Sequence, residues 1–89
     1  MKRLHVIYHG KVQGVGFRFT VMHIAVGLNL TGWVRNKHDG SVEITSEGAE
    51  NKLHAFMSQA EDSFTSYIGS KDVEWQEATG EFSDFRIAH

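Results

Sequence analysis

The chain has 89 residues, of which 40% are hydrophobic and 22% charged, a balance typical of one globular domain, so we expect a single domain over residues 1–89. The absence of cysteine excludes disulfides and thiolate chemistry, and no apolar run approaches the roughly 20 residues of a membrane span, so we expect a cytoplasmic protein without membrane contact. The net charge is −2, but the charges are unevenly distributed, because residues 1–38 contain six basic side chains and no acid. This distribution favours either an anionic ligand or attraction between the basic first half and the acidic second half.

The first half of the chain predicts a strand, a loop, a helix and a second strand. Alternating apolar residues predict a strand from Leu4 to His9, and the glycines of Gly10–Gly16 predict a loop. Apolar residues at helical spacing predict a helix over Phe17–Leu28, with Asn29 in the position of a left-handed cap. Thr31–Asn36 follows as the second strand.

The second half opens with Asp39-Gly40, a strong signal for a hairpin turn. The remaining expected elements are a strand over 41–46, a helix over 49–62, a loop over 64–70, a strand over 72–78 and a short strand over 83–88. The order β-α-β-β-α-β, with a short terminal strand added, predicts an α+β, ferredoxin-like (split β-α-β) sandwich. Its two helices are expected on one face of an antiparallel sheet, so that the loop after the first strand opens onto the start of the first helix.

Residues 10–18 read Gly-Lys-Val-Gln-Gly-Val-Gly-Phe-Arg, a pattern that favours phosphate binding. Glycines let successive backbone N–H groups turn toward an anion, and the first turn of a helix adds free N–H groups and a positive dipole end. Arg18 can donate two parallel bonds to two phosphate oxygens. The alternative is a tight structural turn with a surface arginine. No Gly-Lys-Ser/Thr follows, and Phe19 stands where a dinucleotide fingerprint needs glycine.

Two segments of the chain resemble motifs of the acylphosphatase family. Residues 10–18 are similar to its N-terminal signature, and Leu30–Asn36 (Leu-Thr-Gly-Trp-Val-Arg-Asn) to its second motif, with the Asp39–Glu43 hairpin following as in that family. The likeness is strong over residues 6–56 and weak beyond. Asn29 stands where glycine is usual and Ala49 where proline is common, and residues 63–72 have no clear counterpart.

The resemblance implies a ferredoxin-like fold and an enzyme that hydrolyses the carboxyl–phosphate bond of small acyl phosphates. It implies that Arg18 binds the phosphate and that Asn36 positions the attacking water. The backbone that would hold the phosphate belongs to Gln13, Gly14, Val15, Gly16, Phe17 and Arg18. It implies no metal and no cofactor, with an acyl phosphate and inorganic phosphate as the small-molecule partners. We expect a free-standing monomer rather than a domain of a larger carbamoyl-transfer protein.

Three other interpretations compete with this one. The six histidines invite a metal site, but no zinc spacing appears, and His5 and His9 are about 13 Å apart along one strand. RNA-recognition domains share the element order, yet the third strand, 41–46, has no aromatic side chain and contains Glu43, so we expect no nucleic-acid partner. A domain that binds an anion without turnover stays open. The tryptophans and phenylalanines are expected mainly in the core.

Overall fold

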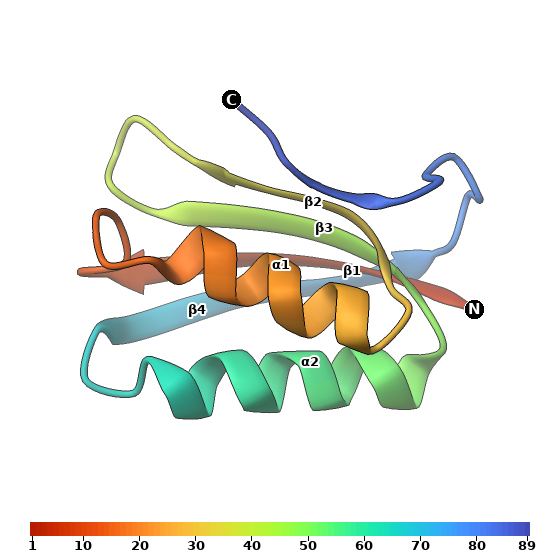
Figure 1. Cartoon of the computed structure of the whole chain (residues 1–89), viewed down its shortest axis with the longest axis horizontal. Coiled ribbons are helices and arrows are strands. Elements are labelled where there is room, and N and C mark those ends of the chain that lie inside the picture. The colour runs from red at the N-terminus through yellow and green to blue at the C-terminus, as the bar shows by residue number, and fades with distance from the viewer.

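A computed structural model describes all 89 residues as two helices packed on one face of a five-stranded sheet (Figure 1). The elements are β1 (Lys2–Gly10), α1 (Phe17–Gly27), β2 (Thr31–Asn36), β3 (Val42–Gly48), α2 (Glu50–Ser63), β4 (Ile68–Glu77) and β5 (Phe85–Ile87). Neither helix is long and apolar enough to cross a membrane.

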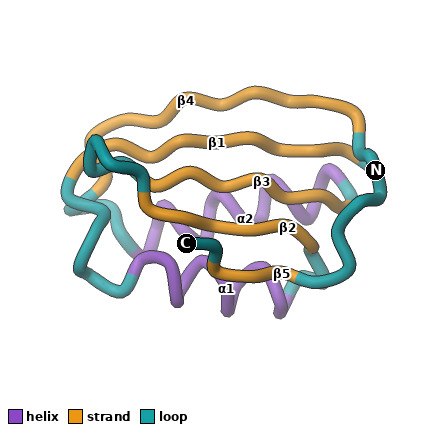
Figure 2. Tube along the Cα trace, turned by 90° about the horizontal axis from the view of Figure 1, so that it is seen from above, coloured by secondary structure: helices purple, strands orange, loops and turns teal.

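The strands lie in the order β4-β1-β3-β2-β5, as seen from above in Figure 2. The pairs β1–β3, β1–β4 and β2–β3 are antiparallel, and this arrangement confirms the predicted ferredoxin-like fold. The short β5 pairs parallel to β2, with Gly32–Val34 opposite Phe85–Ile87, so the complete sheet is mixed rather than purely antiparallel.

The loop predicted over 64–70 ends earlier than expected. Gly10 pairs with Ile68, and the N–H of Lys11 donates to the Tyr67 carbonyl at 2.8 Å, so β4 follows β1 along its whole length. Of Ile68, Gly69 and Ser70, only Ile68 favours a strand by its own propensity. Pairing with β1 therefore sets this boundary, which local sequence does not show.

The start of α1 is held against the sheet by aromatic packing. Leu4, Val6 and Tyr8 alternate along β1 toward the helices and are buried. The ring of Phe17 packs edge-on against Tyr8 at 5.5 Å and against Phe64 at 4.9 Å between centroids. Edge-to-face ring pairs stabilise a fold by more than the burial of their surface alone, so the first turn of α1 has a fixed position over the end of β1.

Not every aromatic residue is in the core as expected. Phe17, Phe56, Phe64 and Phe85 are buried, but Phe19 is 61% exposed and Trp75 is 38% exposed. Trp75 lies on the edge strand β4, and the His54 ring of α2 packs over it at 4.9 Å between centroids. The two helices are too narrow to cover the outermost strand.

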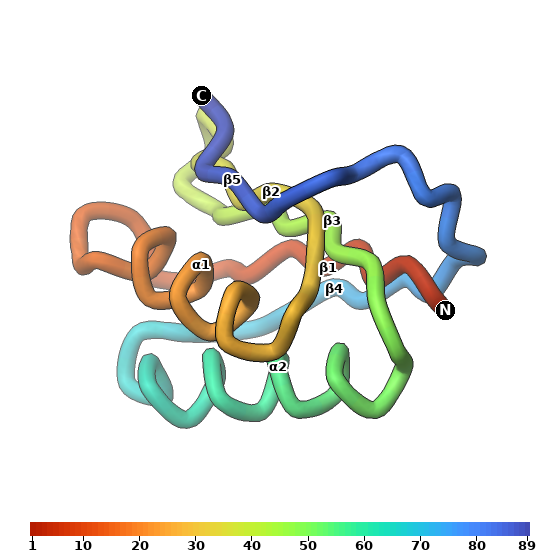
Figure 3. The backbone as a smooth tube through the Cα atoms, turned by 45° about the vertical axis from the view of Figure 1, so that its right-hand side comes forward, coloured from red at the N-terminus to blue at the C-terminus, as the bar shows by residue number.

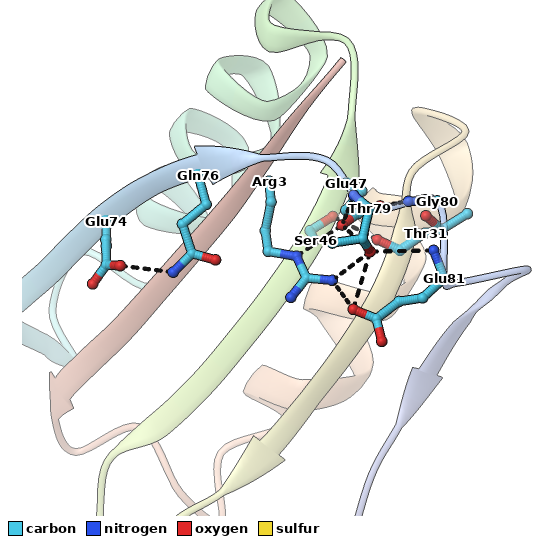
Figure 4. A network of polar contacts seen from close by, with 9 residues as sticks. All are labelled: Arg3, Thr31, Ser46, Glu47, Glu74, Gln76, Thr79, Gly80 and Glu81. Carbon is cyan, nitrogen blue, oxygen red and sulfur yellow. Dashed lines mark hydrogen bonds and ion pairs between the residues drawn. The ribbon is translucent and has the colours of Figure 1, made fainter.

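The connection between β4 and β5 crosses the sheet at the end near the N-terminus (Figure 3). A buried carboxylate holds it there: Glu47 of β3 accepts hydrogen bonds from the N–H of Thr79 and of Gly80, both at 2.9 Å, and from Arg3 at 2.7 Å (Figure 4). Arg3 also donates to Glu81. Burial by itself raises the pKa of Glu47, but the bonds from Thr79, Arg3 and Gly80 outweigh it and lower that pKa to about 2.

The lowered pKa of Glu47 predicts a specific loss of stability in acid. Because that pKa is about 2 when folded against an ordinary 4.5, the contribution is complete above about pH 5 and is lost as the pH falls toward 2. We expect Glu47→Gln to lower the free energy of unfolding at pH 7 by about 2 to 3 kcal/mol. Urea unfolding at pH 7, 5 and 3 measures this. The gap from wild type should shrink in acid, whereas a gap that stays constant would contradict the assignment.

Candidate active site

The segment between β1 and α1 is a loop whose shape depends on two glycines. Gly14 has φ 76° and Gly16, the residue that caps α1, has φ 81°, both in the left-handed region that side chains disfavour. No side chain caps the helix at this end. The loop is anchored at both sides, by Val12, which is buried, and by Phe17.

The backbone amides of this segment are free to bind an anion. None of the N–H groups from Gln13 to Phe19 donates to a protein acceptor, and the first bond of the helix runs from the Thr20 N–H to the Gly16 carbonyl. The first turn of α1 contains no acid that would compete for them. Free amides and the positive end of a helix dipole together form a ready anion site.

Charge pairing separates two groups of basic residues. Three side chains of the first half pair with acids of the second half: Lys2 with Glu77, Arg3 with Glu47 and Glu81, and Arg35 with Glu43. Lys11, Arg18 and Lys37 form no ion pair: Lys11 lies in the loop, Arg18 in the first turn of α1 and Lys37 just after β2. Attraction between the halves therefore accounts for three of the six basic residues, and the three unpaired ones lie around the loop.

Arg18 lines a hollow of about 250 Å³ together with Val12, Gly14, Gly16, Phe17 and Phe19. Its side chain is half-buried and makes no hydrogen bond within the protein. The three other hollows of the surface are larger. In two of them an acid binds the cation: Glu61 binds Lys71 at 2.7 Å, and Asp84 binds Arg86 at 2.9 Å. The third contains no cation. Only the loop hollow combines an unpaired cation with free amides.

Asn36 is the last residue of β2 and leads into the turn before β3. It pairs with Val42, which is buried under the helices, so Asn36 belongs to the helix-bearing face of the sheet. Its side chain is exposed and has no hydrogen bond within the protein. Figure 1 shows the β2–β3 turn and the loop before α1 at the same end of the molecule.

The side chain of Gln13 connects these two segments. Its amide Nε2 donates to the Lys37 carbonyl at 2.7 Å and to the Ser41 carbonyl at 2.9 Å. The family resemblance implies only the backbone of Gln13 as part of the site. No local pattern reveals this contact, because its acceptors are backbone carbonyls more than 20 positions away.

Two nearby carboxylates have structural explanations. Asp39 Oδ1 accepts from the N–H of Ser41 at 2.9 Å, as an Asx turn requires, and bonds from Ser41 hold the Asp39 pKa below its usual value. Glu43 lies on the opposite face, where His5 and Arg35 bind it at 2.7 Å. No three histidine, aspartate or glutamate side chains lie close enough together to form a metal site.

Comparison with known proteins points to one family. The profile of the acylphosphatase family matches residues 4–87. An acylphosphatase of Geobacillus kaustophilus is 40% identical over 90 residues, which cover 100% of this chain and 96% of that protein.

Solved structures agree with the sequence comparison. The crystal structure of an acylphosphatase from Bacillus subtilis superimposes with a TM-score of 0.93 at 37% identity, covering 100% of both chains. T. kodakarensis HypF contains a similar region, with a TM-score of 0.84 at 32% identity, in which this whole chain corresponds to 12% of that protein.

Proposed function

The chain belongs to the acylphosphatase family, a membership that makes it a hydrolase of acyl phosphates, and we propose that Arg18 and Asn36 carry the reaction. The observation that supports this most is the hollow at the start of α1, where an unpaired arginine meets a run of free backbone amides. A guanidinium and free amides both bind a tetrahedral dianion, and their hydrogen bonds to it strengthen as charge develops on the phosphoryl oxygens.

In the proposed reaction, the amides of Gln13, Gly14, Val15, Gly16 and Phe17 and the guanidinium of Arg18 hold the non-bridging oxygens of the phosphoryl group. The Asn36 amide orients a water molecule opposite the acyl oxygen. An amide has no basic atom of the required strength, so the water's proton passes to a phosphoryl oxygen of the substrate.

The water oxygen forms the new bond to phosphorus as the bond from phosphorus to the acyl oxygen breaks. The electron pair of that bond leaves with the carboxylate, and the products are a carboxylate and inorganic phosphate. A carboxylate is a stable leaving group, so the reaction needs no strong general acid. Positioning and charge stabilisation supply most of the rate.

The reaction is proposed to need no metal ion, because Arg18 and the amides supply the positive charge. Purified protein should hydrolyse benzoyl phosphate at an unchanged rate when EDTA is present. The control is the same assay with Mg²⁺ in excess. Activity that EDTA removes and a divalent cation restores would contradict metal independence. Arg18-dependent phosphate binding without any turnover would indicate an anion-binding domain instead.

We propose that one chain suffices, because the loop, Arg18 and Asn36 all come from the same chain. Nucleic acid is not a proposed partner, since the face of β3 away from the helices carries Glu43 and the buried Thr45 and Glu47, and no aromatic side chain on which a base stacks. A cytoplasmic location stays a prediction from the sequence.

A further inference from the structure

The Gln13 side chain reaches both sides of the turn that follows Asn36. Lys37, whose carbonyl accepts one bond, is the next residue after Asn36. Ser41, whose carbonyl accepts the other, precedes Val42, the strand partner of Asn36. The turn is itself closed by a bond from the Lys37 N–H to the Ser41 carbonyl at 2.8 Å. One amide thus binds both sides of the turn at its base, next to Asn36 and next to its strand partner Val42.

Both donors of the Gln13 amide are used in this contact, which leaves it none for a ligand. The acceptors are backbone carbonyls, so the contact fixes the path of the main chain and does not depend on the side chains at 37 and 41. Val12, the neighbour of Gln13, is buried in the core and so fixes the backbone from which the Gln13 side chain extends. The distance between the loop and the end of β2 is therefore set by Gln13.

That distance matters for the proposed chemistry. The phosphate is held by the loop, whereas the water is oriented by Asn36 from a different layer of the fold. In-line attack tolerates little error, and a misplacement of about 1 Å can cost about 100-fold in rate. From this geometry we infer that Gln13 is a positioning residue, which holds Asn36 in line with the phosphate; the inference rests on the proposed function.

A double-mutant cycle separates this role from a general effect on the loop. Gln13→Met keeps the length of the side chain and removes both donors. If Gln13 acts through Asn36, its substitution matters only when Asn36 is present. If it shapes the phosphate cradle or stabilises the fold, its effect persists in the Asn36→Ala protein. The competitive inhibition constant of inorganic phosphate reports the cradle alone.

The experiment measures kcat, KM and phosphate inhibition with benzoyl phosphate for wild type, Gln13→Met, Asn36→Ala and the double variant. Gln13→Met is expected to lower kcat about 10- to 30-fold, with phosphate inhibition within about twofold of wild type. In the Asn36→Ala background the same change should lower kcat by less than about twofold. Gln59→Met, an exposed position on α2, is the matched control and should resemble wild type.

The outcomes are distinct. Equal losses in both backgrounds, or a loss matched by weaker phosphate inhibition, would overturn the inference and leave the proposed function standing. Wild-type kcat in folded Gln13→Met would do the same. If Gln13→Met does not fold, Gln13→Asn replaces it in the cycle, because the shorter amide cannot reach both carbonyls. A wild-type protein without hydrolytic activity would overturn the proposed function and this inference together.

Discussion

Replacing Arg18 with alanine should abolish most of the activity without weakening the fold. The guanidinium is the only side-chain cation in the loop hollow, and its loss should lower kcat/KM for benzoyl phosphate about 1,000-fold. It makes no bond within the protein, and a cation in the first turn of a helix opposes the dipole by about 0.3–1 kcal/mol. The unfolding free energy should therefore stay level or rise slightly, as urea titration of both proteins would measure.

Two further variants make the Arg18 result specific. Arg18→Lys keeps the charge but loses the two parallel donors, and it should recover only a small part of the activity. Arg86→Ala removes an exposed arginine bound only to Asp84 and should leave kcat/KM unchanged. An Arg18→Ala protein that is folded and retains a tenth or more of wild-type activity would contradict the assigned role.

Replacing Asn36 with alanine should lower kcat with little change in substrate binding. Its amide is proposed to orient the water rather than hold the phosphate, so we expect kcat to fall about 100-fold or more, with phosphate inhibition near wild type. Because the side chain is exposed and unbonded, stability should hardly change. Steady-state kinetics with benzoyl phosphate, with phosphate as inhibitor, measure both quantities.

Asn51→Ala supplies the control for this substitution, since Asn51 is an exposed asparagine on the first turn of α2. It should show wild-type kinetics. A rise in the phosphate inhibition constant equal to the fall in kcat/KM, with kcat unchanged, would mean that Asn36 binds the phosphate and does not orient water.

Local chemistry explains which parts of the fold are predictable from sequence. Asn29 has φ 57°, as its predicted left-handed position after the first helix requires. Asp39-Gly40 forms the turn between β2 and β3 because the aspartate accepts from Ser41 and Gly40 adopts φ 92°. Each of these features depends on residues that are neighbours in the chain, so the sequence pattern is sufficient.

Features that depend on partners far along the chain are harder to predict. The start of β4 is set by pairing with β1, and the exposure of Trp75 by the limited width of the helix layer. The same distinction holds for the candidate site. The cradle and Arg18 are contiguous in the sequence, whereas the bonds from Gln13 to the β2–β3 turn join segments that only the fold brings together.

Hydrolysis of benzoyl phosphate in ¹⁸O-labelled water distinguishes attack at phosphorus from attack at the acyl carbon. In the proposed reaction, water attacks the phosphorus held in the loop before α1. Mass spectrometry should then find the label in inorganic phosphate and none in benzoate, in wild-type protein with EDTA present. Label in benzoate would show attack at the acyl carbon and would contradict the proposed reaction, as would a wild-type protein that does not hydrolyse benzoyl phosphate.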